Sequence, residues 1–182
     1  QGFFDVPVDH LYGAPVLNDH FVAKNYSHDE LVIVSPDEGS IKRALGHSKR
    51  LGGKLAIVDK RRTSAEETKQ ENIIGGPVEG RIALMFDDMI SPAGSICWAA
   101  KVLHESGAKE IHVAATHGVL CGGAVERLNN SPIDSVVITD TIPRNPEHLS
   151  EKIEVLSVSQ LLGEAVKRIH RNESISRLFV VN

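Results

Sequence analysis

Short continuous apolar runs alternate along this chain with stretches in which apolar residues recur at helical spacing. The run Leu-Val-Ile-Val at residues 31–34 predicts a strand buried on both faces, and residues 35–39 close it with a turn. A helix is predicted over residues 41–51, because apolar residues share one side of it and Gly52-Gly53 ends the pattern. Its basic residues, Arg43 among them, are expected outside the apolar stripe.

The same order of strand, turn and helix recurs further along the chain. Residues 82–86 predict a second buried strand, residues 87–95 an acidic turn that contains glycine, and residues 96–103 the start of a helix. The remaining predicted elements are strands at 54–58, 111–115, 135–139 and 153–156 and helices at 124–128 and 158–169. This alternation predicts an α/β fold in which helices flank a parallel sheet.

The predicted fold also locates the expected binding site. Ligands of such sheets bind outside the carboxyl ends of the strands. The site should therefore be built from loops 35–40, 59–75, 87–95 and 116–122. Residues 59–77 are rich in charge and weakly periodic, which makes them a candidate mobile loop.

Composition excludes several classes of function. The 182 residues fit a single domain, and no apolar run approaches the roughly 18 residues of a membrane span. The net charge of −4 excludes a broad surface for nucleic acid. Cys97 and Cys121 form no CxxC pair, so we expect reduced cysteines in a cytoplasmic protein. The nine histidines lack HxH and HExxH spacing, so the sequence contains no recognisable zinc-binding motif.

The sharpest chemical signal is the segment that follows the second buried strand. Asp87 and Asp88 stand beside Ser91, Gly94 and Ser95, where hydroxyls and the free N–H groups of a helix start can hold a phosphate. Carboxylates repel a phosphate, so the pair should face sugar hydroxyls or a magnesium ion. A sugar phosphate suits both parts of the segment, because its hydroxyls can bind the carboxylates and its phosphate can bind the N–H groups and hydroxyls. In the alternative interpretation, Asp87 and Ser91 only cap a helix.

Residues 87–96 resemble the ribose-phosphate loop of type I phosphoribosyltransferases and, more closely, that of the ribose-phosphate pyrophosphokinases. The resemblance extends to four further segments, at residues 1–9, 35–37, 116–118 and 139–143. Members of this family carry two related α/β domains, and this chain is similar to the C-terminal domain and the final tail. We therefore expect the domain with most of the ATP pocket, and a metal-binding histidine upstream of Gln1, to lie outside this chain.

The resemblance implies transfer of the diphosphoryl group of MgATP to O1 of ribose 5-phosphate. Lys60 would stabilise charge in the transition state and Arg62 would bind ATP phosphates, although a basic run is more often a solvated surface. Asp37 would coordinate Mg²⁺, and it can also cap the following helix. The implied ribose-5-phosphate site comprises Asp87, Asp88, Ser91, Pro92, Ala93, Gly94 and Ser95.

One part of this segment departs from the family pattern. The family usually has Asp-Thr where this chain has Ser91-Pro92. Pro92 removes a backbone N–H and a hydroxyl from the cradle, and losing a charge-assisted donor is expected to weaken phosphate binding by about 1.5–3 kcal/mol. The smaller repulsion from Ser91, in place of an aspartate, partly offsets this loss.

The two ends of the chain also match family positions. Gln1 and Asp9 match positions that, with three tail residues, line a regulatory phosphate or ADP site between subunits; the tail residues are Ser174, Ser176 and Phe179. The two serines are expected to alternate along an extended segment, although an ordinary polar terminus explains them equally well. Residues 1–12 and 174–182 of the single domain 1–182 are expected to pack on an N-terminal domain or on a neighbouring copy in a homo-oligomer.

Three functions remain open from the sequence. The first is the ribose-5-phosphate domain of a pyrophosphokinase. The second is a phosphoribosyltransferase. That enzyme needs an additional segment that recognises the base, and no segment outside the matched elements of this chain is long enough to supply it. The third is a noncatalytic regulatory or assembly subunit, which Pro92 and the absence of the expected partner domain favour and the retained charged residues disfavour. Fold analogy alone does not choose between them.

Overall fold

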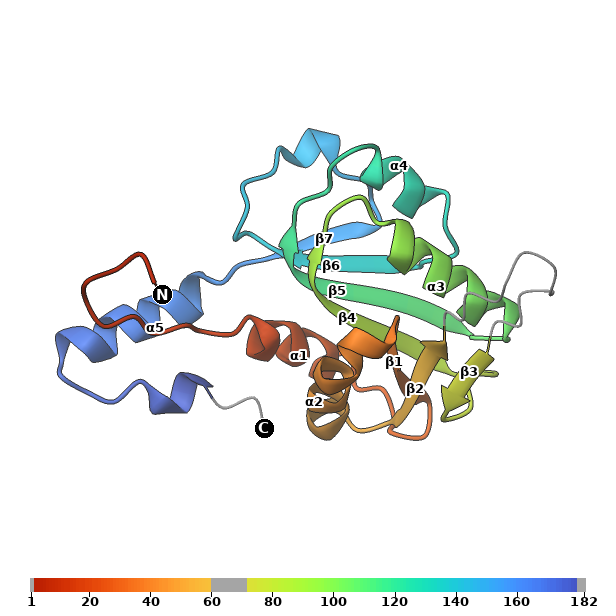
Figure 1. Cartoon of the computed structure of the whole chain (residues 1–182), viewed down its shortest axis with the longest axis horizontal. Helices are drawn as coiled ribbons and strands as arrows, with labels where there is room; N and C mark the ends of the chain where they lie inside the picture. Colours follow the sequence, from red (N-terminus) through yellow and green to blue (C-terminus); the bar gives the residue numbers. More distant parts are fainter. Residues whose placement is uncertain (1, 60–71, 180–182) are drawn as a thin grey trace.

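The computed structural model of the chain describes residues 2–59 and 72–179, and these form an α/β fold around a seven-stranded sheet (Figure 1). The strands lie in the order β3-β2-β1-β4-β5-β6-β7. All neighbouring pairs are parallel except β2 and β3, which are antiparallel. The strands are β1 (Leu31–Ser35), β2 (Lys54–Asp59), β3 (Asn72–Gly75), β4 (Ile82–Ile90), β5 (Glu110–Gly118), β6 (Ser135–Thr139) and β7 (Ile153–Leu156).

Helices cover both faces of the sheet (Figure 1). The helices are α1 (Ala14–Val22), α2 (Ile41–Leu51), α3 (Gly94–Glu105), α4 (Ala124–Asn129) and α5 (Ser159–His170). Short 3₁₀ turns span Glu38–Ser40, Pro146–His148 and Ser176–Phe179. Helices α1 and α2 pack on one face, α3 and α4 pack on the other, and α5 extends away from the sheet (Figure 1).

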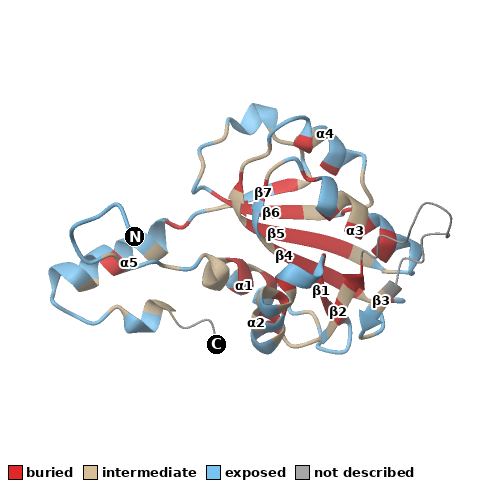
Figure 2. Cartoon of the chain, viewed as in Figure 1, coloured by how far each residue is buried: buried red, intermediate tan, exposed pale blue. Residues whose placement is uncertain are grey.

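The apolar runs of the central strands are continuous because both faces are buried (Figure 2). Successive strand residues point to opposite faces. Val32 and Val34 therefore belong to the core under α3 and α4, whereas Leu31 and Ile33 belong to the core under α1 and α2. Among the residues that the structure describes, no helix combines the length and apolar character needed to cross a bilayer.

The predicted α/β fold is confirmed, but several elements differ from the prediction. Helix α1 was not predicted, because its buried side consists of Leu17, Asn18 and Phe21, and the polar Asn18 interrupts the apolar stripe. Residues 72–75 form the edge strand β3 rather than a loop, while residues 60–71 of the predicted mobile loop lie outside the described part of the chain. Strand β4 continues past its predicted end at Phe86, because its last residues keep pairing with the long strand β5.

A buried histidine joins α2 to the core of the sheet. His47 is 4% exposed and stacks on Phe86, with ring centroids 3.6 Å apart and planes 9° apart. Its Nδ1 lies 2.6 Å from Oδ1 of Asn18 on α1. Burial and then the charge of Arg43 lower the pKa of His47 from 6.5 to about 4. The imidazole is therefore neutral in the folded protein at neutral pH.

This burial predicts a specific acid sensitivity. Because the folded pKa lies below the unfolded value, the contribution of His47 to stability is full above pH 6.5 and is lost as the pH falls towards 4. Between pH 7 and pH 5 the wild type should lose about 2 kcal/mol of unfolding free energy that the variant His47→Gln does not lose. Urea unfolding at both pH values measures this difference. Equal pH slopes in the two proteins would contradict it.

Candidate functional site

The centre of the sheet brings two of the predicted loops together. Strand β1 lies between β2 and β4, so the chain moves outward from β1 in both directions along the sheet. Ligands of open α/β sheets bind at such a switch point, outside the carboxyl ends of the strands. The turn that holds Asp37 follows β1, and the pair Asp87-Asp88 lies near the end of β4. The expected location of the site is therefore consistent with the fold.

Asp87 and Asp88 lie within β4, not in the turn where the sequence analysis placed them. Asp87 pairs in register with Ala115 of β5, so the strand carries both carboxylates before the loop begins. The side chain of Asp87 is 25% exposed and that of Asp88 is 60% exposed. A strand is a more rigid support for these groups than a turn, because its backbone is paired on the β5 side through Ile90.

Arg43 contacts both carboxylates, which the sequence analysis missed. Its Nη1 lies 2.5 Å from Oδ1 of Asp87, and its Nη2 lies 3.3 Å from Oδ1 of Asp88. The sequence interpretation placed Arg43 outside the apolar stripe of α2, which is correct, but the pattern carried no information on which strand that side of the helix adjoins. Backbone N–H groups of Asp88 and Met89 also donate to the Oδ1 atoms of Asp87 and Asp88, at 2.8 and 3.1 Å. Oδ1 of each carboxylate is therefore engaged.

The two carboxyl groups have different proton affinities. Burial, followed by the neighbouring carboxyl of Asp88, raises the pKa of Asp87 from 3.8 to about 6, and the charge of Arg43 only partly offsets this. The hydrogen bond with Asp87 is the main reason that the pKa of Asp88 is lowered. The pair therefore holds one proton at mildly acidic pH and is fully charged at higher pH.

The residues of the predicted anion cradle lie in the loop after β4 and at the start of α3. Ala93 adopts a left-handed backbone with φ of 62°, and α3 begins at the next residue. The N–H groups of the first helical turn have no partners within the helix, so they are available to an anion. A Cβ added at Gly94 would meet no atom within 4 Å, which leaves the space in front of this turn open. Ser95 is exposed, and the hydroxyl of Ser91 lies 3.2 Å from the thiol of Cys121.

Asp37 has the capping role that the sequence allowed. Its carboxylate accepts the N–H of Ser40 at 2.8 Å, and its own carbonyl accepts the hydroxyl of Ser35 at 2.7 Å. The residue is exposed, so a second carboxylate oxygen remains open to a ligand. Within residues 2–59 and 72–179, no group of three His, Cys, Asp or Glu residues could hold a metal ion. A metal bound at Asp37 would depend on ligands from elsewhere.

A cavity of about 540 Å³ opens beside Asp88 and Arg43. His117 lines it, with Nδ1 2.8 Å from the hydroxyl of Thr141. His117 belongs to β5 and pairs with Met89, so it is a strand residue rather than the predicted loop residue. Residues 10–13 and the first turn of α5 complete the lining, which brings the N-terminal segment next to the carboxylate pair.

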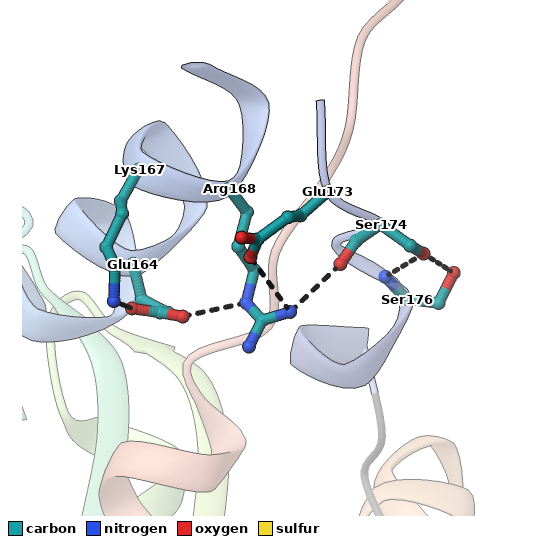
Figure 3. A network of polar contacts seen from close by, with 6 residues as sticks. All are labelled: Glu164, Lys167, Arg168, Glu173, Ser174 and Ser176. Atoms are coloured by element: carbon teal, nitrogen blue, oxygen red, sulfur yellow. Dashed lines mark hydrogen bonds and ion pairs between the residues drawn. The ribbon is translucent and has the colours of Figure 1, made fainter. Parts of the chain in front are cut away.

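The tail serines differ from the extended segment that the sequence predicted (Figure 3). Ser176 begins a 3₁₀ turn, and the Ser174 hydroxyl accepts its N–H at 3.2 Å and donates to its hydroxyl at 2.9 Å. Local serine bonds of this kind favour turns over extended backbone. Arg168 links this turn to α5 through the Ser174 carbonyl at 3.2 Å and Glu164 at 2.8 Å.

The remaining predicted site residues lie in other parts of the chain. Lys60, Arg62 and Gln1 lie outside the described residues. Asp9 is exposed, and Phe179 is half-buried at the end of the described tail. In the described part of the chain, no hydrogen bond or ion pair joins Asp9 to the serine turn. The regulatory phosphate site therefore stays a prediction.

Comparison with known proteins identifies strong similarities over almost the whole chain. The family model of the phosphoribosyl synthetase-associated domain matches residues 65–180. A ribose-phosphate pyrophosphokinase of Rhodopirellula baltica is 70% identical over 98% of this chain and 57% of its own length. A ribose-phosphate pyrophosphokinase of Bacillus subtilis is 46% identical over 98% of this chain and 56% of its own length. The chain thus spans about half the length of the curated relatives it matches.

Solved structures agree with this similarity. The crystal structure of phosphoribosylpyrophosphate synthetase from Mycobacterium smegmatis matches with a TM-score of 0.82 and 34% identity, covering 94% of this chain and 55% of that protein. The crystal structure of APRTase from Giardia lamblia complexed with 9-deazaadenine matches with a TM-score of 0.51 and 10% identity, covering 79% of this chain and 76% of that one. The second likeness concerns the fold alone, and it agrees with the α/β fold of helices flanking a parallel sheet that the sequence predicts.

The raised pKa of Asp87 predicts how the protein responds to pH. Because the folded pKa lies above the unfolded value, the stabilising contribution of this group is full below pH 3.8 and is lost as the pH rises through 6. The unfolding free energy of the variant Asp87→Asn, relative to that of the wild type, should therefore increase as the pH rises. This difference should be about 1 kcal/mol more favourable to the variant at pH 7.5 than at pH 5. Urea unfolding of both proteins checks this, and carboxyl NMR should show Asp87 titrating near pH 6. A constant stability difference would contradict it.

Proposed function

Because this chain belongs to the phosphoribosyl synthetase-associated family, we propose that it binds ribose 5-phosphate as part of a ribose-phosphate pyrophosphokinase. The observation that carries the proposal is the carboxylate pair of β4 next to an open helix start. In the proposed reaction, the O1 hydroxyl of ribose 5-phosphate attacks the β-phosphorus of ATP. The bond from that phosphorus to the α–β bridging oxygen breaks, AMP leaves, the O1 proton passes to solvent, and 5-phosphoribosyl 1-diphosphate is formed.

The two halves of the site divide the substrate between them. The sugar hydroxyls donate hydrogen bonds to Asp87 and Asp88, whose Oδ1 atoms already hold Arg43. The 5-phosphate meets the N–H groups at the start of α3 and the exposed hydroxyl of Ser95. Arg43 reduces the repulsion between the carboxylates and the phosphates, so both can be held in one site. This division places O1 at a defined position for attack, which is the main requirement of phosphoryl transfer.

The remaining catalytic groups are assigned from the matching family positions. Lys60 stabilises charge on the transferred group and Arg62 binds ATP phosphates; both lie outside the described residues. Asp37 suits Mg²⁺, because its exposed carboxylate is a hard oxygen ligand and this ion commonly binds to one or two carboxylates plus substrate phosphates. Bound there with ATP, Mg²⁺ would neutralise phosphate charge during the transfer.

A second candidate function rests on Pro92. This residue removes an N–H from the cradle, so a noncatalytic regulatory or assembly subunit of such a synthetase is the alternative. Such a subunit would bind ribose 5-phosphate weakly and would not form AMP.

We place the protein in the cytoplasm, because its Cys97 and Cys121 are both unpaired.

Partners are proposed from exposed apolar surface. Phe3 is 99% exposed, and Leu162, Val166 and Ile169 expose one face of α5 at helical spacing. Exposed apolar faces of this kind mark contacts with other protein. We propose that residues 1–12, α5 and residues 174–182 contact a second copy of the chain or an N-terminal domain. The regulatory phosphate site of Gln1, Asp9, Ser174, Ser176 and Phe179 would lie at this contact.

Calorimetry with ribose 5-phosphate tests the proposed site. The full chain should bind it, and Asp87→Asn should bind about tenfold or more weakly because an anionic acceptor is lost. Pro92→Thr should bind about tenfold more tightly, since it restores an N–H and a hydroxyl. Glu105→Gln, at the far end of α3, is the matched control and should bind as the wild type does.

Three results would count against these assignments. No heat with the wild type would contradict the proposed function. Unchanged or weaker binding by Pro92→Thr would remove the argument about the missing N–H. If the full-length protein binds ribose 5-phosphate but forms no AMP from MgATP, the noncatalytic alternative is favoured.

Sedimentation tests the proposed contact face. The wild type should sediment as an assembly larger than one copy, and the double variant Leu162→Glu with Val166→Glu should sediment as a monomer, because charges cannot be buried at that face without partners. Gln160→Glu, which adds charge at an exposed position of the same helix, should leave the assembly intact. A wild type that stays monomeric at high concentration would contradict self-association.

A further inference from the structure

The carbonyl groups of residues 90–93, at the end of β4 and in the loop after it, all accept hydrogen bonds within the protein. The carbonyls of residues 90–92 accept hydrogen bonds from the backbone N–H groups of Leu120 and Cys121, at 2.9 and 3.1 Å, and from Nη1 of Arg127, at 2.6 Å. The next carbonyl, that of Ala93, accepts the first helical hydrogen bond of α3 at 3.0 Å. Four consecutive carbonyls are therefore engaged within the protein.

This arrangement matters for an anion at the cradle. A carbonyl oxygen repels a phosphate, whereas an N–H attracts it, so a phosphate loop must direct its carbonyls elsewhere. Backbone donors satisfy the first two carbonyls, but the third depends on a side chain from α4. That third carbonyl belongs to Pro92, whose nitrogen carries no hydrogen and supplies no compensating attraction. The peptide group of this carbonyl also contains the N–H of Ala93, which points the opposite way, so its orientation decides whether the loop presents an acceptor or a donor to the anion.

We propose that Arg127 is a positioning residue for the phosphate cradle: its guanidinium holds the Pro92 carbonyl away from the space in front of Gly94. The proposal rests on the proposed binding of ribose 5-phosphate. Ala93 follows Pro92 in a left-handed conformation that an alanine adopts only when its surroundings hold it there. The charge-assisted bond from Arg127 supplies such a restraint, because hydrogen bonds from a guanidinium are stronger than neutral ones.

The test separates positioning from direct contact with the phosphate. Arg127→Met keeps much of the side-chain length and removes the donor, Arg127→Lys keeps the charge and one donor, and Glu126→Gln is the exposed control on the same helix. Without ligand, Arg127→Met should shift the amide NMR signals of Ala93 and Gly94, since the restrained peptide is released. Calorimetry should then show ribose 5-phosphate binding about tenfold more weakly than in the wild type. Arg127→Lys should lie between the two, and the control should match the wild type.

Each outcome bears on one proposal. Wild-type affinity in Arg127→Met, or weaker binding with unchanged loop amides in the unliganded protein, would overturn the positioning role. Equal weakening of ribose and of ribose 5-phosphate would also overturn it, because only the phosphate faces the cradle. If the wild type fails to bind ribose 5-phosphate, the proposed function is wrong, and inorganic phosphate becomes the probe. If inorganic phosphate shifts the amide NMR signals of Ala93 and Gly94 in the wild type, and Arg127→Met abolishes these shifts, the positioning role of Arg127 is still supported. If phosphate causes no such shifts in the wild type, the positioning role is overturned.

Discussion

The pairing of β4 with β5 beyond the buried core is the constraint on which the site depends. Ile82 to Phe86 pair with β5 inside the core, and the ladder then continues through Asp87, Met89 and Ile90 to Gly118. Because this extension is paired backbone, the two carboxylates and His117 occupy fixed positions at the edge of the sheet. The cradle loop starts where the ladder ends, and the segment after β5 binds its first carbonyls. Carboxylates, cradle and cavity therefore share one support.

Charge at this edge is balanced by groups that come from different elements. Arg43 of α2 contacts both carboxylates, and the pair lies next to a helix start suited to an anion. The raised pKa of Asp87 reflects burial that Arg43 only partly offsets. A phosphate ester with neighbouring hydroxyls matches this arrangement of charge. Its phosphate would meet the N–H donors at the start of α3, and its hydroxyls would donate to the carboxylate oxygens. Arg127 and Pro92 then determine how well the cradle presents those donors.

Helix α5 and the two ends of the chain have a different character from the sheet. Ala165 is the one buried residue of α5, and Leu162, Val166 and Ile169 are exposed on it. The same helix helps to line the cavity beside Asp88. A partner that covers α5 would therefore lie close to the carboxylate pair, which would couple assembly to the proposed site.

Most of the fold could be predicted from the sequence, because continuous apolar runs and helical stripes report burial directly. Residues 41–51, 135–139 and 153–156 form elements with the predicted bounds, and the carboxylates and cradle were located as neighbours in the chain. Local pattern could not predict β3, since an antiparallel edge strand depends on the partner that β2 offers. Nor could it predict the contacts of Arg43 and Arg127, which are 44 and 35 residues from their partners Asp87 and Pro92. The sequence determined which chemical groups are present and which elements carry them; tertiary structure decided which charges meet, because packing of helices on the sheet brings distant residues together.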